Sequence, residues 1–116
     1  MAKYFKESEF CCKHCGQLPA GGVDEKLIRV LDAMRAMVNK PLIISSGYRC
    51  PVHNANVGGV RNSFHVQGCA ADVLLPDGVT VDELADIAEK CGADGIGRYY
   101  DQEFVHVDTR GYVARW

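Results

Sequence analysis

Four residues of this chain combine types and spacings that suit a catalytic metal ion. His65 is followed seven positions later by Asp72, and His106 stands three positions after Glu103. Two imidazoles and one carboxylate are typical ligands of a catalytic zinc ion, because three protein ligands leave the fourth tetrahedral position open for water. A carboxylate nearby can accept a proton from that water. The pattern predicts one zinc ion bound by the two histidines and the aspartate, with Glu103 beside it.

The residues around these side chains make the prediction more specific. Ser63 and Gly68 complete a Ser-x-His-x-x-Gly-x-Ala-x-Asp arrangement, and the upstream segment 45–49 reads Ser-Ser-Gly-Tyr-Arg. Gly68 allows the turn that lets the histidine reach back over the strand carrying the aspartate. From about Phe10 to Trp116 the chain resembles the zinc D-alanyl-D-alanine carboxypeptidases and D,D-dipeptidases, which share their fold with hedgehog signalling domains.

The resemblance implies catalytic roles for residues that do not bind the metal. Glu103 matches the general base, which takes a proton from water and delivers it to the leaving amine. Asp101 is the second candidate for this base. Arg49 lies sixteen residues before His65, the spacing that the carboxypeptidases use for an arginine that handles the substrate. It is expected to pair with a substrate carboxylate or an oxyanion, and it is also suited to clamping the loop around Asn54.

Two further residues are expected beside the metal ligands. Asp108 follows His106 by two positions, so on a strand both side chains point to the same face. There Asp108 is expected to accept a hydrogen bond from a ligand histidine or to orient a neighbouring arginine. An exposed carboxylate on the strand fits the sequence equally well. Ser63 is expected to support the site or to contact the substrate.

Six cysteines in 116 residues suggest a second metal site. Cys12 and Cys15 have zinc-knuckle spacing, and Cys50 with His53 repeats it. A structural zinc ion bound by these four side chains is one interpretation. The same residues equally fit buried thiols that hold the N-terminal segment against the loop after Arg49, so both interpretations stay open.

The composition is that of a globular domain. Hydrophobic residues make up 47% and charged residues 24%, with a net charge of −2. No basic stripe is present to meet the phosphates of a nucleic acid, and no apolar run is long enough to span a bilayer. The N-terminal sequence lacks a hydrophobic signal core, so we expect a protein made in the cytoplasm. Three explanations stay open for its access to a substrate outside the cell: release to the cell wall as in phage or prophage enzymes, trimming of a longer precursor, or action on a dipeptide inside the cell. We expect a monomer.

Hydrophobic periodicity predicts two helices and a small sheet. Helices are expected over residues 24–39 and 81–91, and Thr80 with Glu83 forms a capping box for the second. Strands are expected over residues 42–46, 70–75, 95–99 and 104–109, the last two joined by a hairpin turn at 101–102. Residues 1–22 are expected to form an irregular arm. The predicted fold class is α+β, hedgehog-like, with a largely antiparallel sheet, two main helices on one face, and the ligands at strand ends and loops on the other.

These features predict a single zinc peptidase domain over residues 1–116. The expected substrate is a peptidoglycan stem peptide or a D-Ala-D-Ala peptide, cleaved next to a D-amino acid in the manner of a carboxypeptidase. Three alternatives are a phage-type cell-wall endopeptidase, a non-catalytic hedgehog-like zinc-binding module, and an interaction protein built around its cysteines. Glu103 together with all three ligands favours an enzyme over a module that has lost catalysis.

Overall fold

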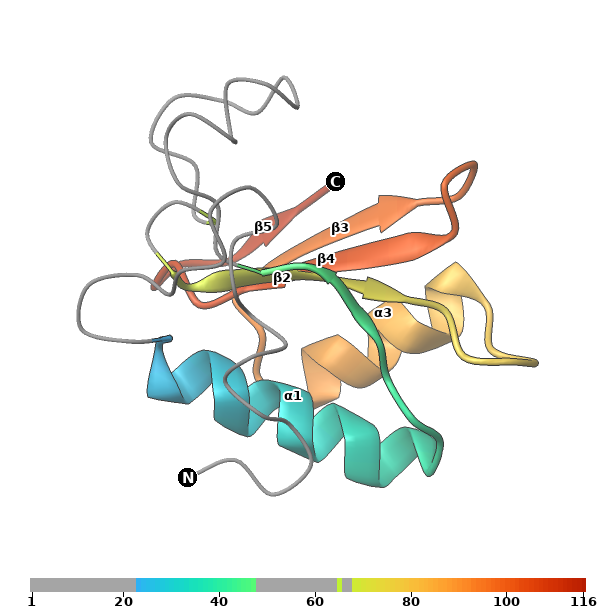
Figure 1. Ribbon diagram of the computed structural model, residues 1–116. Helices are drawn as coiled ribbons and strands as arrows, with labels where there is room; N and C mark the ends of the chain where they lie inside the picture. Colours follow the sequence, from blue (N-terminus) through green and yellow to red (C-terminus); the bar gives the residue numbers. More distant parts are fainter. Residues whose placement is uncertain (1–22, 48–64, 66–67) are drawn as a thin grey trace.

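Two helices lie against one face of a five-stranded sheet (Figure 1). The computed structural model describes residues 23–47, 65 and 68–116. The predicted α+β fold with both helices on one face is confirmed, and the predicted arm over residues 1–22 lies outside the described residues. The elements are α1 (Glu25–Val38), β1 (Ile44–Ser46), β2 (Ala70–Leu74), α3 (Val81–Lys90), β3 (Gly95–Tyr99), β4 (Phe104–Asp108) and β5 (Ala114–Arg115).

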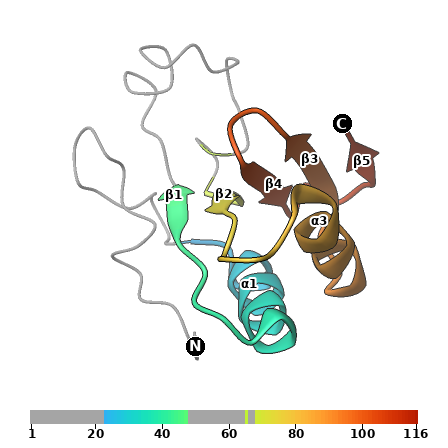
Figure 2. The same cartoon turned by 90° about the vertical axis from the view of Figure 1, so that its right-hand side faces the viewer.

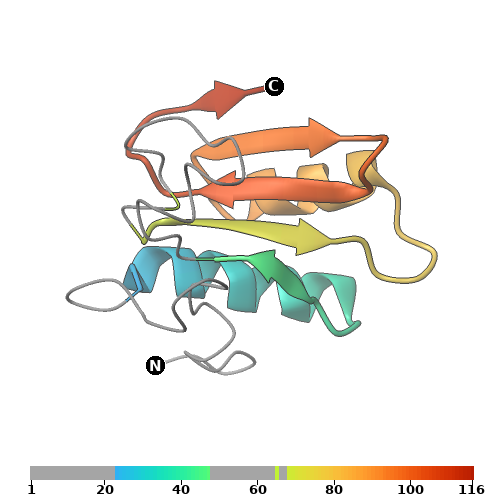
Figure 3. The ribbon, with the colours of Figure 1, turned by 45° about the horizontal axis from the view of Figure 1, so that its top comes forward.

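The strands lie in the order β1-β2-β4-β3-β5 (Figure 3). The pairs β1–β2, β2–β4 and β3–β4 are antiparallel, whereas β5 runs parallel to β3. The predicted hairpin of β3 and β4 is present. The fifth strand was not predicted, because a strand of two residues is too short to show an alternating pattern. The sheet is therefore largely antiparallel, as expected, with one parallel edge.

The helices and the sheet, seen end-on in Figure 2, enclose a hydrophobic core. Val105 and Val107 of β4 are fully buried on the helix side. Side chains alternate along a strand, so His106 between them points to the opposite, open face of the sheet, as predicted. The helices and β2 and β3 contribute further core side chains, namely Leu27, Val30, Leu31, Met34, Leu84, Ala85, Ala88, Val73 and Ile96.

The ends of the elements follow local signals in the sequence. The predicted capping box of α3 is present: Thr80 Oγ1 accepts a hydrogen bond from the Glu83 amide, and Glu83 Oε1 accepts one from the Thr80 amide, both at 3.1 Å. The first strand begins at Ile44 and not at residue 42 as predicted, and its register with β2 shifts between Ile44 and Ser46. Among the described residues, neither helix has the length and apolar character needed to cross a membrane.

Candidate metal centre

Three side chains meet on the open face of the sheet. Asp72 and His106 occupy directly opposite positions on β2 and β4, and His65 reaches them from the turn before β2. One nitrogen or oxygen atom from each lies within 4.8 Å of the others, and all three residues are buried. We expected the ligands at strand ends and loops. Two of them instead come from strand centres, because the register pairs Asp72 with His106 in mid-sheet.

The distances within this cluster suit a tetrahedral ion. Asp72 Oδ1 lies 3.2 Å from His65 Nε2 and 3.0 Å from His106 Nδ1. Zinc bonds of about 2.0–2.2 Å at tetrahedral angles place two ligand atoms about 3.3–3.6 Å apart. Within the described part of the chain, His65 Nε2 is fully buried and makes no hydrogen bond. A buried polar atom without a partner is costly, and a cation in the cluster would satisfy it. The residues therefore fit zinc.

Backbone contacts fix the orientation of His65. Its Nδ1 lies 2.8 Å from the carbonyl oxygen of Gly47, directly after β1. Donation from Nδ1 to that carbonyl leaves the lone pair of Nε2 free for a metal ion. The Gly68 amide donates to the His65 carbonyl at 3.2 Å, and Gly68 has φ of 78°, in the left-handed region that favours glycine. The turn expected at Gly68 is present.

A carboxylate fixes the orientation of His106. His106 Nε2 lies 2.8 Å from Asp108 Oδ2, while its Nδ1 faces Asp72. Asp108 is 0% exposed and also accepts hydrogen bonds from the Gly95 amide at 3.0 Å and from Arg110 Nη2 at 2.6 Å. The sequence suggested a histidine or a neighbouring arginine as its partner, and the structure shows both. A proton held on Nε2 leaves the Nδ1 lone pair for the metal.

Opposite shifts in pKa keep this cluster charged. Burial raises the pKa of Asp72, but the hydrogen bond with His106 and the charges of His106 and His65 outweigh it and hold the pKa far below its ordinary range. Burial likewise raises the pKa of Asp108, and hydrogen bonds from His106 and Arg110 reverse that shift. For His106, burial lowers the pKa, and hydrogen bonds to Asp108 and Asp72 raise it overall. Both carboxylates are therefore ionised at neutral pH.

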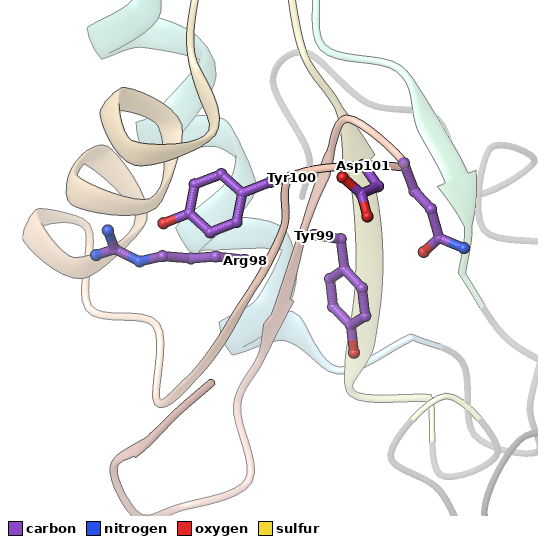
Figure 4. Close-up of a pocket in the computed structure, with 5 residues that line it drawn as sticks. Arg98, Tyr99, Tyr100 and Asp101 are labelled. Carbon is purple, nitrogen blue, oxygen red and sulfur yellow. The ribbon is translucent and has the colours of Figure 1, made fainter.

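The two candidates for the general base lie in the turn between β3 and β4. Glu103 is exposed, immediately precedes β4 and has φ of 56°. Its carboxylate is not among the ligand atoms gathered within 4.8 Å. Asp101 is also exposed, and it lines a pocket of about 450 Å³ together with Arg98, Tyr99, Tyr100 and Gln102 (Figure 4). The role of either carboxylate stays a prediction.

Several residues singled out in the sequence lie outside the described residues. These are Arg49, Ser63, Cys12, Cys15, Cys50 and His53, so a second zinc site also stays a prediction. Of the described cysteines, Cys69 lies beside the cluster in sequence and is half-buried. Burial and the charges of Asp108 and Asp24 raise the pKa of its thiol to about 11. This thiol stays protonated, which suits packing better than metal binding.

Three contributors to the site were not singled out from the sequence. Arg110 binds Asp108, the Gly95 backbone lies directly beneath the Asp108 carboxylate, and the Trp116 ring lies 5.0 Å from the His106 ring. A Cβ atom at Gly95 would lie 2.2 Å from Asp108 Oδ2. Glycine at position 95, in the Gly-Ile-Gly run of β3, was the available signal, since a glycine inside a strand marks a close approach.

The fold and this cluster together define a small α+β protein with a buried histidine–aspartate–histidine site suited to a metal ion. A model of the family described as peptidase M15 matches residues 3–108, so the chain belongs to the peptidase M15 family. The resemblance to the zinc D-alanyl-D-alanine carboxypeptidases noted in the sequence is thereby confirmed.

Named relatives give this membership a closer context. The chain is 34% identical over 83 residues to a probable peptidoglycan L,D-endopeptidase, MepK, of Haemophilus influenzae, a match covering 67% of the chain and 44% of that protein. It is 32% identical over 82 residues to MepK of Escherichia coli, covering 66% and 44%. It is 50% identical over 44 residues to a zinc D-Ala-D-Ala carboxypeptidase of Streptomyces albus G, covering 37% and 17%. The chain thus matches less than half the length of each relative.

Proposed function

We propose that this protein is a zinc-dependent peptidase that hydrolyses a peptide bond next to a D-amino acid in peptidoglycan or a related cell-wall peptide. The observation that carries the proposal is the buried cluster of His65, Asp72 and His106, in which His65 Nε2 has no hydrogen-bond partner among the described residues. Membership of the peptidase M15 family supports it. So do relatives named for peptidoglycan and for D-Ala-D-Ala.

Each residue of the site has a separate role in the proposed hydrolysis. When bound, zinc supplies a Lewis acid that polarises the scissile carbonyl and acidifies water. Asp72 supplies negative charge to the site, and Asp108 holds His106 with Nδ1 directed at the cluster. Glu103 accepts a proton from the attacking water and delivers it to the leaving amine nitrogen, with Asp101 as the second candidate. Arg49 pairs with the substrate carboxylate or with the oxyanion.

Two kinds of bond are candidates for cleavage. A terminal D-Ala-D-Ala bond fits the carboxypeptidase of Streptomyces albus G, which shares the higher identity. A bond between an L- and a D-residue fits the endopeptidases, whose match extends over 67% of the chain against 37% for the carboxypeptidase. This wider match makes endopeptidase activity the second candidate. The two differ in the need for a free C-terminal carboxylate.

Metal analysis combined with a cleavage assay tests the proposal. Wild-type protein and His106→Ala would be purified, loaded with zinc, and incubated with purified peptidoglycan, and each new amine would be identified. We expect wild type to bind zinc and release new amino groups, a chelator to abolish this, and added zinc to restore it. His106→Ala should bind little zinc at this site. A zinc-loaded wild type that releases no amine from peptidoglycan or from free D-Ala-D-Ala would contradict the proposal.

His53→Ala serves as the matched control, because it removes an imidazole from the possible cysteine site and leaves the buried cluster intact. If wild type binds a second zinc ion at Cys12, Cys15, Cys50 and His53, this variant should lose one equivalent and retain cleavage. If wild type and His53→Ala both bind one equivalent of zinc, the second zinc site does not exist.

Free and amidated substrates separate the two kinds of bond. Arg49 offers a planar guanidinium that holds a carboxylate through two hydrogen bonds, which lysine cannot reproduce. A carboxypeptidase should cleave a peptide ending in D-Ala-D-Ala and lose activity both on its C-terminal amide and after Arg49→Lys. An endopeptidase should cleave free and amidated peptides at similar rates.

A further inference from the structure

Trp116 is held in a fixed position beside the metal centre. Its amide donates to the Ile96 carbonyl at 3.1 Å, and its carbonyl accepts from the Arg98 amide at 2.8 Å. Its indole Nε1 donates to Tyr99 Oη at 2.8 Å, and the Arg110 guanidinium lies 5.0 Å from the ring centre. Both backbone and side chain of Trp116 are therefore fixed before any ligand arrives.

Gly97 leaves room on the sheet for the indole ring of Trp116. Gly97 lies opposite His106 in the β3–β4 ladder, in the row that also contains Asp72. A Cβ atom at position 97 would lie 2.6 Å from Cε2 and Nε1 of Trp116, a separation that any other residue would have to relieve by moving the ring. Glycine thus allows the indole to lie on the sheet next to His106, at a ring-centre distance of 5.0 Å.

Despite these contacts, Trp116 remains 46% exposed. A large apolar ring that is exposed to water next to a metal centre can contact a ligand with little further loss of side-chain entropy, because the fold already fixes its orientation. The aromatic surface continues along the same face: Tyr99 and Phe104 are paired in the ladder and their rings stack at 4.3 Å. A peptide whose carbonyl reaches the cluster would therefore run beside Trp116.

We propose that Trp116 forms one wall of the substrate cleft and contacts the small alkyl side chain of the residue next to the scissile bond. The inference rests on the proposed peptidase function. An open aromatic wall, rather than a deep pocket, suits a short side chain such as the methyl group of alanine. Trp116 is then a specificity-determining residue that contacts the substrate and does not bind the metal.

Kinetics with a pair of substrates test the wall. Stem peptides carrying alanine or glycine next to the cleaved bond would be compared for wild type, Trp116→Ala and Trp116→Phe. We expect wild type to prefer alanine by about tenfold in kcat/KM, as for one methyl group in an apolar site. Trp116→Ala should lose this preference and raise KM, Trp116→Phe should keep part of it, and all three should bind the same amount of zinc. Tyr112→Ala is the matched control, since its ring lies over the same Arg110 and is 61% exposed.

Two outcomes would contradict the proposed role of Trp116. One is an alanine preference that survives in Trp116→Ala. The other is loss of zinc together with activity, which would make Trp116 a support for His106 instead. Fluorescence of the wild type gives a readout that does not depend on the variants folding, because Trp116 is the only tryptophan.

A stem peptide that covers the indole should shift its emission to shorter wavelength, and this signal requires no turnover. Unchanged emission at peptide concentrations that saturate cleavage would count against the wall. If wild type cleaves nothing, the proposed function fails, while an emission shift on adding the peptide would still support the contact.

Discussion

His106 lies between two carboxylates, and each contacts a different nitrogen of its ring. Asp108 Oδ2 is 2.8 Å from Nε2, and Asp72 Oδ1 is 3.0 Å from Nδ1. Asp108 is held by Gly95 and Arg110 and is fully buried, so it cannot turn toward the substrate. Its part is to keep one ring nitrogen protonated and to direct the other at the metal.

At the residue scale we predict that Asp108→Asn weakens zinc binding by about 10- to 100-fold, the usual effect of losing a partner that orients a metal ligand. The physical reason is that His106 loses a charged acceptor at Nε2. Competition with a chromogenic chelator measures the affinity. Asp86→Asn, at an exposed position on α3, is the control and should bind zinc as wild type does. Equal affinities for all three proteins would mean that Asp108 only holds Arg110.

A second prediction at this scale concerns the general base. Glu103→Gln should bind zinc normally but lower kcat by about a hundredfold or more, because an amide cannot carry the proton. Asp101→Asn, two positions earlier in the same exposed turn, is the matched comparison. If Asp101→Asn carries the larger loss and Glu103→Gln turns over almost normally, the base is Asp101.

At the scale of the elements, the pairing of β2 with β4 sets the geometry of the site. Asp72 and His106 face each other because their strands are antiparallel neighbours in this register. A shift of one residue would move His106 to the helix side of the sheet. Thr109 strengthens the end of this pairing: its amide donates to the Cys69 carbonyl at 3.0 Å, and its hydroxyl donates to Asp24 just before α1.

The helices support the sheet from the face opposite the metal centre, so their defects should affect stability and spare the site. Thr80→Ala removes the side chain that caps α3, and we expect it to lower the free energy of unfolding by about 1 kcal/mol. Urea denaturation measures the change. Thr80→Ser keeps the hydroxyl and should retain most of the stability. Zinc affinity should be unchanged in both, and a loss of zinc in Thr80→Ala would show that α3 and the metal centre are coupled.

At the scale of the whole molecule, zinc and folding should be linked. An ion that binds the folded chain alone stabilises it by about 2.7 kcal/mol at a hundredfold excess over its dissociation constant. Binding needs both imidazoles neutral, and the pKa of His106 is raised by its two carboxylates despite burial. Protons therefore compete with zinc at a higher pH than at an ordinary histidine, whose pKa is about 6.5.

We accordingly predict that zinc raises the melting temperature at neutral pH and that the increase shrinks as the pH falls through the His106 pKa. Asp72 stays ionised over this range, because its pKa is lowered. In the metal-free protein the pH dependence of stability has the opposite sign, because protonated His106 contributes stability that is lost as the pH rises. Thermal melts with and without zinc across this range measure both trends. A zinc effect independent of pH would place the bound ion away from the histidines.

The sequence by itself determined the family, the fold class and the three residues that meet in the cluster. Periodicity gave α1 and α3, and the two-residue spacing of His106 and Asp108 assigned both to one face of a strand. These signals are local, so they can be read without knowing which strands are neighbours.

Only the tertiary structure decided what surrounds the cluster. Strand register placed both Asp72 and Gly97 opposite His106, one on each neighbouring strand. The parallel pairing of β5 with β3 brought Trp116 to the metal centre, although it lies ten positions after His106 in the sequence. The bond between Arg110 and Asp108 likewise depends on side-chain packing at the end of β4. The contacts of Asp72, Gly97 and Trp116 with His106 arise through sheet pairing, and pairing leaves no periodic signal in a single sequence.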